Sequence, residues 1–302
     1  MIVYINDIFD IIPESVVCKL YADDLKIYTT GPSDLDTESN NESVLQNCLD
    51  SIQKWASDWQ LQISVKKCYH SHTGRVLVKA VPEHGTFYIN NDIVQFSETV
   101  SDLGVLVDCE LKFTAHINKI TSRALNRANL IHKCFLSKDA STLVKAFKIY
   151  VRPVLEYCSP VWSPRLIKDI QRIEAVQRRF TKRIPGMERV KYSDRLRFLG
   201  LETLDTRRLK ADLILAYKIL FGLVNVDIRK YFEFAKLPST RGHQYKLFVH
   251  RWKNSTRQHF FASRVVPVWN NLPNSVEFSS LKKFKLSIET VDLSKYCREI
   301  YS

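Results

Sequence analysis

The chain has 302 residues, 45% of them hydrophobic, which predicts a globular protein with a sizeable core. Lys and Arg outnumber Asp and Glu by 45 to 32, giving a formal charge of +13 and a pI of about 9.4. This balance favours a polyanionic partner, although an ordinary basic surface gives the same totals. No apolar stretch reaches the roughly eighteen residues that a membrane span needs and no secretory signal is visible, so no membrane partner is expected.

The cysteines are odd in number, and no pair has the two-residue spacing of a zinc knuckle or a redox motif. This pattern predicts reduced thiols in an intracellular protein, either nuclear or cytoplasmic. Two clusters of Cys and His lack a matching half, so metal ligation there is disfavoured against simple burial. The seven positions are Cys18, Cys48, Cys68, Cys109, Cys134, Cys158 and Cys297.

Two adjacent carboxylates, Asp23 and Asp24, lie between short apolar runs, and residues 16–29 are predicted to form a strand, a turn and a second strand. A helix follows, with Trp55 and Trp59 on its apolar face and expected in the core. "LQISV" at 61–65 alternates like a strand that ends at Lys66 and Lys67. Further strands are expected at 75–81, 86–90, 93–96 and 103–108.

From Phe113 onward the sequence changes to long amphipathic helices. They are predicted near 113–135, 141–157, 166–184 and 204–222, with a break at "SPVWSP" and shorter helices near 260 and 280. Phe260, Phe261 and Trp269 are expected to anchor the last helices in the core. His116 is expected to pack or cap a helix and not to act in catalysis.

Cations recur along two of these helices, and such a row can follow a nucleic-acid backbone through contacts that weaken with salt. The alternative is a solvated helix face without a ligand. The candidate residues are Lys119, Arg123 and Arg127 on the first helix, and Arg165, Lys168, Arg172, Arg178, Arg179, Lys182 and Arg183 on or before the third.

The Asp23 and Asp24 pair also has two readings. Neighbouring carboxylates repel each other unless a cation is present, and Mg²⁺ prefers oxygen ligands supplied by one or two carboxylates and substrate phosphates. Against this, aspartate is common in turns because it bonds to nearby backbone. The dipeptide alone does not decide between a metal site and a turn.

The residues around the pair resemble a known family. "YADD" between two apolar strands is similar to the catalytic hairpin of reverse transcriptases. "WASDWQLQISVKKC" and "VSDLGVLVDCELKFTAHI" resemble the following blocks of non-LTR retrotransposon enzymes of the jockey-like and related LINE groups. "YVRPVLEYCSPVWSP", "IEAVQRRFTKRIPG" and "FFASRVVPVWNNLP" are similar to the helical region after the polymerase core in those elements. The resemblance is collinear and covers nearly the whole chain.

The resemblance implies an RNA-directed DNA polymerase that uses Mg²⁺, an RNA template, a DNA primer and a dNTP. It implies that Asp23 and Asp24 are metal-binding catalytic carboxylates and that Lys67 lies near the incoming nucleotide. It also implies that Leu103, Gly104 and Val105 form a strand that grips the primer end. Ser64 and Phe113 depart from the family pattern, where Asn and Trp are usual.

A polymerase of this family also has another catalytic aspartate, a Gln-Gly turn and basic fingers, which precede the hairpin and are not recognisable here. The chain is therefore expected to resemble the C-terminal part of the enzyme and to be inactive alone. The alternatives are a nucleic-acid-binding module without chemistry, or the remnant of a truncated element.

The expected fold class is α+β. Residues 1–80 are predicted to form a partial polymerase palm, with the YADD hairpin and one helix. Residues 81–112 should form a small β segment, 113–225 a helical thumb and 226–302 a helical extension. Palm strands without partners would be prone to pair with other chains, so poor solubility is expected.

Overall fold

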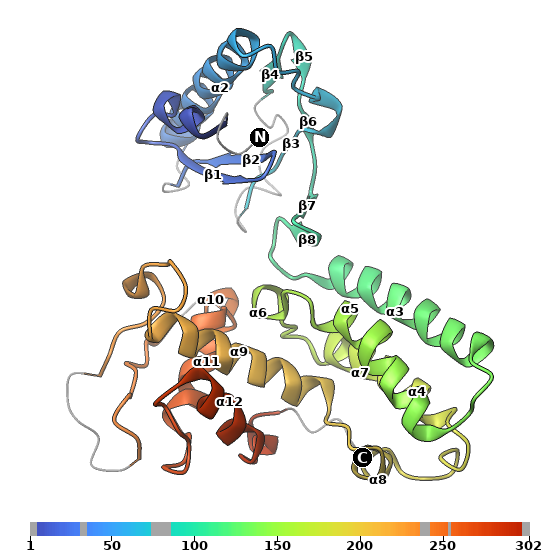
Figure 1. Cartoon of the computed structure of the whole chain (residues 1–302). Helices are drawn as coiled ribbons and strands as arrows, with labels where there is room; N and C mark the ends of the chain where they lie inside the picture. Colours follow the sequence, from blue (N-terminus) through green and yellow to red (C-terminus); the bar gives the residue numbers. More distant parts are fainter. Residues whose placement is uncertain (1–4, 31–34, 74–85, 236–241, 253–254, 298–302) are drawn as a thin grey trace. The chain divides into compact units, whose positions relative to one another are not determined.

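The computed structural model describes residues 5–30, 35–73, 86–235, 242–252 and 255–297 (Figure 1). The chain divides into two compact units, Met1–Leu111 and Lys112–Ser302, which we describe separately. The first unit combines short strands with helices and the second is almost entirely helical, so the expected α+β class is confirmed. Among the helices described, none combines the length and apolar character needed to cross a membrane.

In its described residues the first unit contains four separate two-stranded sheets and one long helix. β1 pairs with β2, β4 with β5 and β7 with β8 in antiparallel fashion, and β3 pairs with β6 in parallel. The elements are η1 (Asn6–Ile11), β1 (Val17–Tyr21), β2 (Asp24–Tyr28), α2 (Leu35–Asp58), η2 (Val65–Lys67), β3 (Tyr69–His70), β4 (Tyr88–Ile89), β5 (Asp92–Ile93), β6 (Gln95–Phe96), β7 (Thr99–Asp102) and β8 (Val105–Asp108).

The core of this unit lies between α2, η1 and one face of the β1–β2 hairpin. Cys48 and Ile52 of α2 are buried with Ile8 and Val16. Apolar side chains at alternate hairpin positions pack on this cluster because successive side chains in a strand point to opposite faces. They are Leu20, Leu25 and Ile27.

Three sequence predictions in this unit are wrong and one cannot be assessed. Residues 61–64 form no strand; the Lys67 amide donates to the Ser64 carbonyl at 2.9 Å, which closes a 3₁₀ turn in place of an extended chain. Trp59 lies beyond the end of α2 and is 49% exposed, so it is not a core residue. The third error, at 103–104, concerns the candidate site and is described below. The strand expected at 75–81 lies outside the described residues.

The second unit is helical, with helices at the predicted positions near 113–135, 141–157, 166–184 and 204–222 and with α8, which was not predicted, between the last two. They are α3 (Thr114–Cys134), α4 (Ala140–Ala146), η3 (Phe147–Val151), α5 (Arg152–Glu156), α6 (Ser159–Trp162), α7 (Ile167–Lys182), α8 (Tyr192–Leu199), α9 (Leu204–Leu220), η4 (Ile228–Lys230), α10 (Ser255–Gln258), α11 (Phe261–Asn270), α12 (Leu281–Glu289) and η5 (Ser294–Tyr296). The predicted break at "SPVWSP" contains the single turn α6, because Pro160 is tolerated at a helix start.

α3 and α7 pack side by side and run in the same direction. The Thr114 hydroxyl donates to Asp169 at 2.8 Å near their starts, and Arg183 donates to Asn129 at 2.6 Å near their ends. Both helices bury apolar stripes between these points, as the periodicity predicts: Ile117, Ile120, Ala124, Ala128 and Ile131 of α3, and Ile170, Ile173, Val176 and Phe180 of α7.

A second apolar cluster joins α9 to α11 and α12. Trp269, Phe284 and Phe261 are buried in it, and the Tyr217 hydroxyl donates to the Phe278 carbonyl at 2.8 Å. Phe260, which was expected to share this core, is 38% exposed. It is the N-cap residue of α11 and stacks on Tyr231, whereas its neighbour Phe261 enters the cluster.

Candidate functional site

The two adjacent carboxylates lie at the tip of the β1–β2 hairpin, as predicted. Tyr21 pairs with Asp24 in the strand register, so Ala22 and Asp23 form a two-residue loop. Ala22 has φ of 54°, a left-handed conformation that a two-residue hairpin loop requires and that glycine adopts more readily. Both carboxylates are exposed.

The hairpin has two chemically different faces. Leu25 and Ile27 are half-buried against the core, whereas Asp24, Lys26 and Tyr28 alternate with them and are exposed. Asp24 therefore projects from the outer face, and Asp23 extends from the turn itself. The two carboxylates are open to a ligand from solvent.

The hairpin offers the type of ligand atom, carboxylate oxygen, that a hard divalent cation prefers. Asp23 and Asp24 supply carboxylate oxygens, and Mg²⁺ is typically bound by one or two carboxylates with water and substrate phosphates completing its shell. No group of three or more His, Cys, Asp or Glu side chains in the described part of the chain is arranged to hold a metal ion. The residues thus fit a site in which substrate supplies the remaining ligands.

Lys67 lies in η2 and is exposed. Its ammonium makes no ion pair with a carboxylate among the described residues, so it is available to an anionic ligand. The structure places it in the same unit as the hairpin but gives no direct contact between them.

Leu103, Gly104 and Val105 form a tight turn and the start of a strand, which corrects the strand expected at 103–108. Leu103 and Gly104 have φ of 45° and 86° and connect β7 to β8, and Val105 is the first residue of β8. Two successive positive φ values are the mark of a hairpin turn and cannot continue a strand. Leu103 is exposed at the tip, whereas Val105 is buried.

An ion pair joins the two hairpins, and the sequence analysis missed it. Lys26 Nζ lies 2.6 Å from Asp102 Oδ2, connecting the outer face of β2 to the residue before the Leu103–Gly104 turn. The pairing partners are 76 residues apart in sequence, so only the fold brings them together. The carboxylate hairpin and the β7–β8 turn are therefore held as neighbours.

A second candidate site is the α3–α7 basic face, which we define as Lys119 and Arg123 of α3 with Lys168, Arg172, Arg179 and Lys182 of α7 and Arg183, the residue that follows α7. All seven side chains are exposed. Four of them follow one another at intervals of four, seven and four residues, so they lie within about 60° of each other around the helix axis. They are Lys168, Arg172, Arg179 and Arg183. Asn118 and Asn129 of α3 accept hydrogen bonds from Arg172 and Arg183, which joins the cations of the two helices into one surface.

The acids on these helices do not neutralise this face. α3 contains no Asp or Glu, and the two acids of α7, Asp169 and Glu174, are buried. Within ion-pair distance we find a single contact to the face among the described residues, between Arg172 and Asp169 at 3.8 Å. A solvated helix face usually interleaves charges of both signs, so this arrangement favours an anionic ligand over that alternative.

Three other cations named by the sequence have intramolecular roles. Arg127 donates to the Tyr150 carbonyl at 3.0 Å, Arg165 lies 3.5 Å from the Thr256 hydroxyl, and Arg178 stacks over the Tyr192 ring at 5.1 Å. Each is half-buried. His116 is also a packing residue, with its ring 5.2 Å from Trp162, and burial lowers its pKa.

Comparison with known proteins identifies the first unit. The reverse transcriptase (RNA-dependent DNA polymerase) family matches residues 1–107. The RNA-directed DNA polymerases from mobile element jockey of Drosophila funebris and Drosophila melanogaster are 24% and 25% identical over 174 and 180 residues. The chain carries a reverse transcriptase region of the non-LTR, LINE-like type.

The extent of these matches is limited. Each jockey match covers 57% of this chain and 18% of the polymerase, so the chain spans less than a fifth of those relatives. An uncharacterized protein of Caenorhabditis elegans is 27% identical over 126 residues, 41% of this chain and 64% of that protein. No solved structure matches.

The reverse transcriptase match ends within β8, so the β1–β2 hairpin and all of the β7–β8 hairpin except Asp108 lie inside it, and the α3–α7 basic face lies outside. The charges divide in a similar way. Residues 112–302 hold 38 of the 45 Lys and Arg and 15 of the 32 Asp and Glu, a formal charge of +23, whereas residues 1–111 carry −10. The unit with the carboxylate hairpin is acidic, and the unit with the basic face carries the whole positive excess.

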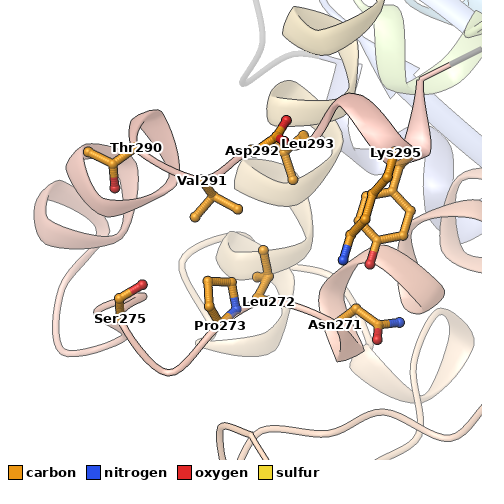
Figure 2. A pocket seen from close by; sticks show the side chains of 10 residues that line it. Asn271, Leu272, Pro273, Ser275, Thr290, Val291, Asp292, Leu293 and Lys295 are labelled. Carbon is orange, nitrogen blue, oxygen red and sulfur yellow. The ribbon is translucent and has the colours of Figure 1, made fainter. Parts of the chain in front are cut away.

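A surface hollow of about 250 Å³ lies elsewhere in the second unit (Figure 2). None of the site residues predicted from the sequence lines it. Its lining combines amide, hydroxyl and aliphatic groups with one carboxylate and one ammonium, and consists of Asn271, Leu272, Pro273, Ser275, Thr290, Val291, Asp292, Leu293, Lys295 and Tyr296. Hydrogen bonds from Ser294 hold the pKa of Asp292 below its usual value.

Proposed function

We propose that this reverse transcriptase region is part of an RNA-directed DNA polymerase and is inactive alone, with the β1–β2 hairpin contributing to the site at the primer end and the α3–α7 basic face binding nucleic-acid backbone. The observation that carries the proposal is the exposed Asp23–Asp24 pair on the outer face of a hairpin tied through Lys26 and Asp102 to a second hairpin. The carboxylate pair, Lys26, Asp102 and the Leu103–Gly104 turn all lie within the residues that match the reverse transcriptase family.

In this proposal Asp23 and Asp24 hold Mg²⁺ against the primer and the nucleotide. The chemistry such a cation supplies when bound is stabilisation of the attacking and leaving oxygens of phosphoryl transfer. The hairpin directs the Asp24 carboxylate away from the core, so it is accessible to a cation from solvent, and a bound cation would be needed to attract an anionic substrate. Lys67 binds the phosphates of the incoming dNTP, which suits an exposed ammonium that makes no ion pair within the described part of the chain.

The β7–β8 turn supports the primer strand. Leu103 offers an exposed apolar side chain to the primer. Gly104 carries no Cβ, so the primer backbone can approach the turn closely at this residue. Val105 is buried and anchors the turn from beneath. The ion pair to Lys26 then sets the distance between the primer support and the carboxylates.

We assign residues 1–80 to a palm, 81–112 to the primer-support segment, 113–225 to a thumb and 226–302 to an extension. The α3–α7 basic face belongs to the thumb and binds phosphates of both template and primer. An intracellular setting, nuclear or cytoplasmic, suits the free cysteines of the chain.

The test of this proposal is the salt dependence of binding to a fluorescein-labelled RNA–DNA hybrid, measured by anisotropy. The triple variant Lys119→Gln, Arg123→Gln, Arg179→Gln should reduce the slope of log K against log salt by about 2.7, since each phosphate contact contributes about 0.9. The matched control is Lys282→Gln, Lys283→Gln, Lys285→Gln on α12, which removes the same charge from exposed positions elsewhere. Equal effects of the two triples would refute the assignment of the face.

A second candidate is nucleic-acid binding without chemistry. It is favoured by the size of the positive excess in residues 112–302 and by the small donor set of two carboxylates at the hairpin. Primer extension separates the two functions. With two carboxylates we expect no template-directed synthesis by the chain alone; synthesis that disappears in Asp23→Asn would show instead that this chain completes the site.

A further inference from the structure

A row of rings lies at the surface of the second unit, outside the α3–α7 basic face. Within residues 248–252 every second side chain carries a ring: Phe248 and His250 are exposed and Trp252 is half-buried. The Phe248 and His250 rings are 4.8 Å apart between centroids, and His250 and Trp252 are 5.4 Å apart.

A cation continues this row between two further rings. The Arg257 guanidinium lies 4.8 Å from the centroid of Trp252 and 4.8 Å from that of Phe260. Phe260 in turn stacks on Tyr231 at 6.5 Å with an interplanar angle of 17°. We call Phe248, His250, Trp252, Arg257, Phe260 and Tyr231 the aromatic ladder.

The ladder is fixed from beneath. Tyr231 contacts the buried rings of Phe232 and Phe261, which belong to the α9–α11–α12 core. Gln258 Nε2 donates to the Trp252 carbonyl at 2.6 Å, which fixes the segment that ends at Trp252 to α10. The rings are thus held in place before any ligand binds, which lowers the entropic cost of binding.

The outer surface of the ladder is open. Phe248 is 47% exposed and Phe260 is 38% exposed, and Arg251 and Arg257 are exposed beside them. The nearest acid is Glu233, whose carboxylate lies 3.8 Å from His250. The exposed rings of Phe248, His250 and Phe260 thus lie beside positive charge, a combination that a purely apolar partner would not match.

We propose that the aromatic ladder is a binding site for single-stranded nucleic acid. Unpaired bases stack on exposed rings whatever their sequence, and interleaved cations neutralise the phosphates that follow the bases. A duplex hides its base faces, so it cannot use such a platform. The site is separate from the α3–α7 basic face and does not depend on the polymerase role proposed above.

The test uses the full chain with fluorescein-labelled 20-mers of oligo(U) and oligo(dT) and with a duplex of the same length. Trp252→Ala should weaken binding of the single strands about tenfold or more and leave duplex binding unchanged, because one stacking platform is lost. Trp252→Phe should restore most of the affinity, since any aromatic ring can stack. Comparing oligo(U) with oligo(dT) shows whether the strand is RNA or DNA.

The matched control is Val249→Ala, an exposed neighbour outside the ladder that should change neither affinity. Circular dichroism establishes that each variant is folded. Unchanged single-strand binding in folded Trp252→Ala, or equal losses for single strand and duplex, would overturn the proposal. Arg257→Gln provides an independent measure: it should lower the single-strand salt slope by about 0.7.

Discussion

Glu174 is an ionisable residue that the sequence places among the cations of α7 and the structure places in the core. It has no exposed surface; its carboxylate accepts hydrogen bonds from the Tyr192 hydroxyl and from the Leu204 amide, the latter at 2.9 Å. Burial raises the pKa of Glu174 above its ordinary value, more than these hydrogen bonds and Arg208 lower it. The residue therefore ties α7 to α8 and α9 at an electrostatic cost.

This cost predicts a pH dependence of stability. A carboxyl whose pKa is raised by folding stabilises the native state below its unfolded pKa, about 4.3, and this contribution is lost as pH rises through the folded pKa. Glu174→Gln cannot ionise, so its free energy of unfolding relative to wild type should increase as pH rises above about 4.3. Urea unfolding at several pH values measures the difference, with exposed Asp194→Asn as control; a difference that does not change with pH would contradict the assignment.

For single residues, the sequence showed which side chains could bind metal or nucleic acid better than it showed which of them lie close together in the fold. Asp23 and Asp24 could be located because a hairpin tip is encoded locally. The contact of Lys26 with Asp102 could not, because the residues are far apart in sequence. The alternation of Phe248, His250 and Trp252 is visible in the sequence. It does not predict the aromatic ladder by itself, because the positions after 225 show no regular period that would assign them to an element.

Among the elements, the β7–β8 turn requires a positive φ at a position that is occupied by leucine, a residue that rarely adopts one. Leu103 has φ of 45°, a conformation that costs most residues about 1–2 kcal/mol and suits Asn better. A bulky apolar residue in this position reduces stability and leaves its side chain exposed at the tip.

We therefore expect Leu103→Asn to stabilise the chain by about 1 kcal/mol in urea unfolding, because the strain is relieved and little burial is lost. Leu61→Asn makes the same chemical change at an exposed leucine of the same unit with negative φ, and should give no gain. A loss of stability in Leu103→Asn would show that the leucine side chain, and not the backbone, dominates this turn.

The helices were predictable and several strands were not, for a physical reason. α3, α7 and α9 each bury a stripe with helical period, which is set by residues within the helix itself. A strand needs a partner, and "LQISV" has the alternation but no pairing, so it closes a 3₁₀ turn. Leu103 and Gly104 were predicted to begin a strand because they precede an apolar run. Gly in such a run fits a turn equally well, and the structure has the turn.

For the whole molecule, the division of charge at residue 111 follows the division of structure. Each described apolar cluster draws its buried residues from one unit only. The second unit carries +23 and the first −10. Backbone binding and metal-dependent chemistry are thus assigned to units of opposite charge.

We predict that residues 112–302 fold without the first unit, with cooperative loss of helical circular dichroism on heating, because their core is their own. This fragment should keep the salt-dependent affinity of the whole chain for an RNA–DNA hybrid, measured by anisotropy. Residues 1–111, tested in parallel, should bind the hybrid at least tenfold more weakly because of their negative charge. Non-cooperative melting of 112–302 would contradict the division.

The central claim is that nucleic acid held by the chain reaches Asp23 and Asp24. Fe²⁺ can replace Mg²⁺ at carboxylate sites, and with ascorbate and peroxide it generates hydroxyl radicals that cut nucleic acid close to the ion. We predict cleavage of an end-labelled template–primer at one cluster of positions, lost in Asp23→Asn, Asp24→Asn and retained in the exposed control Asp58→Asn. Cleavage spread evenly along the strand, or unchanged by loss of both carboxylates, would contradict the claim.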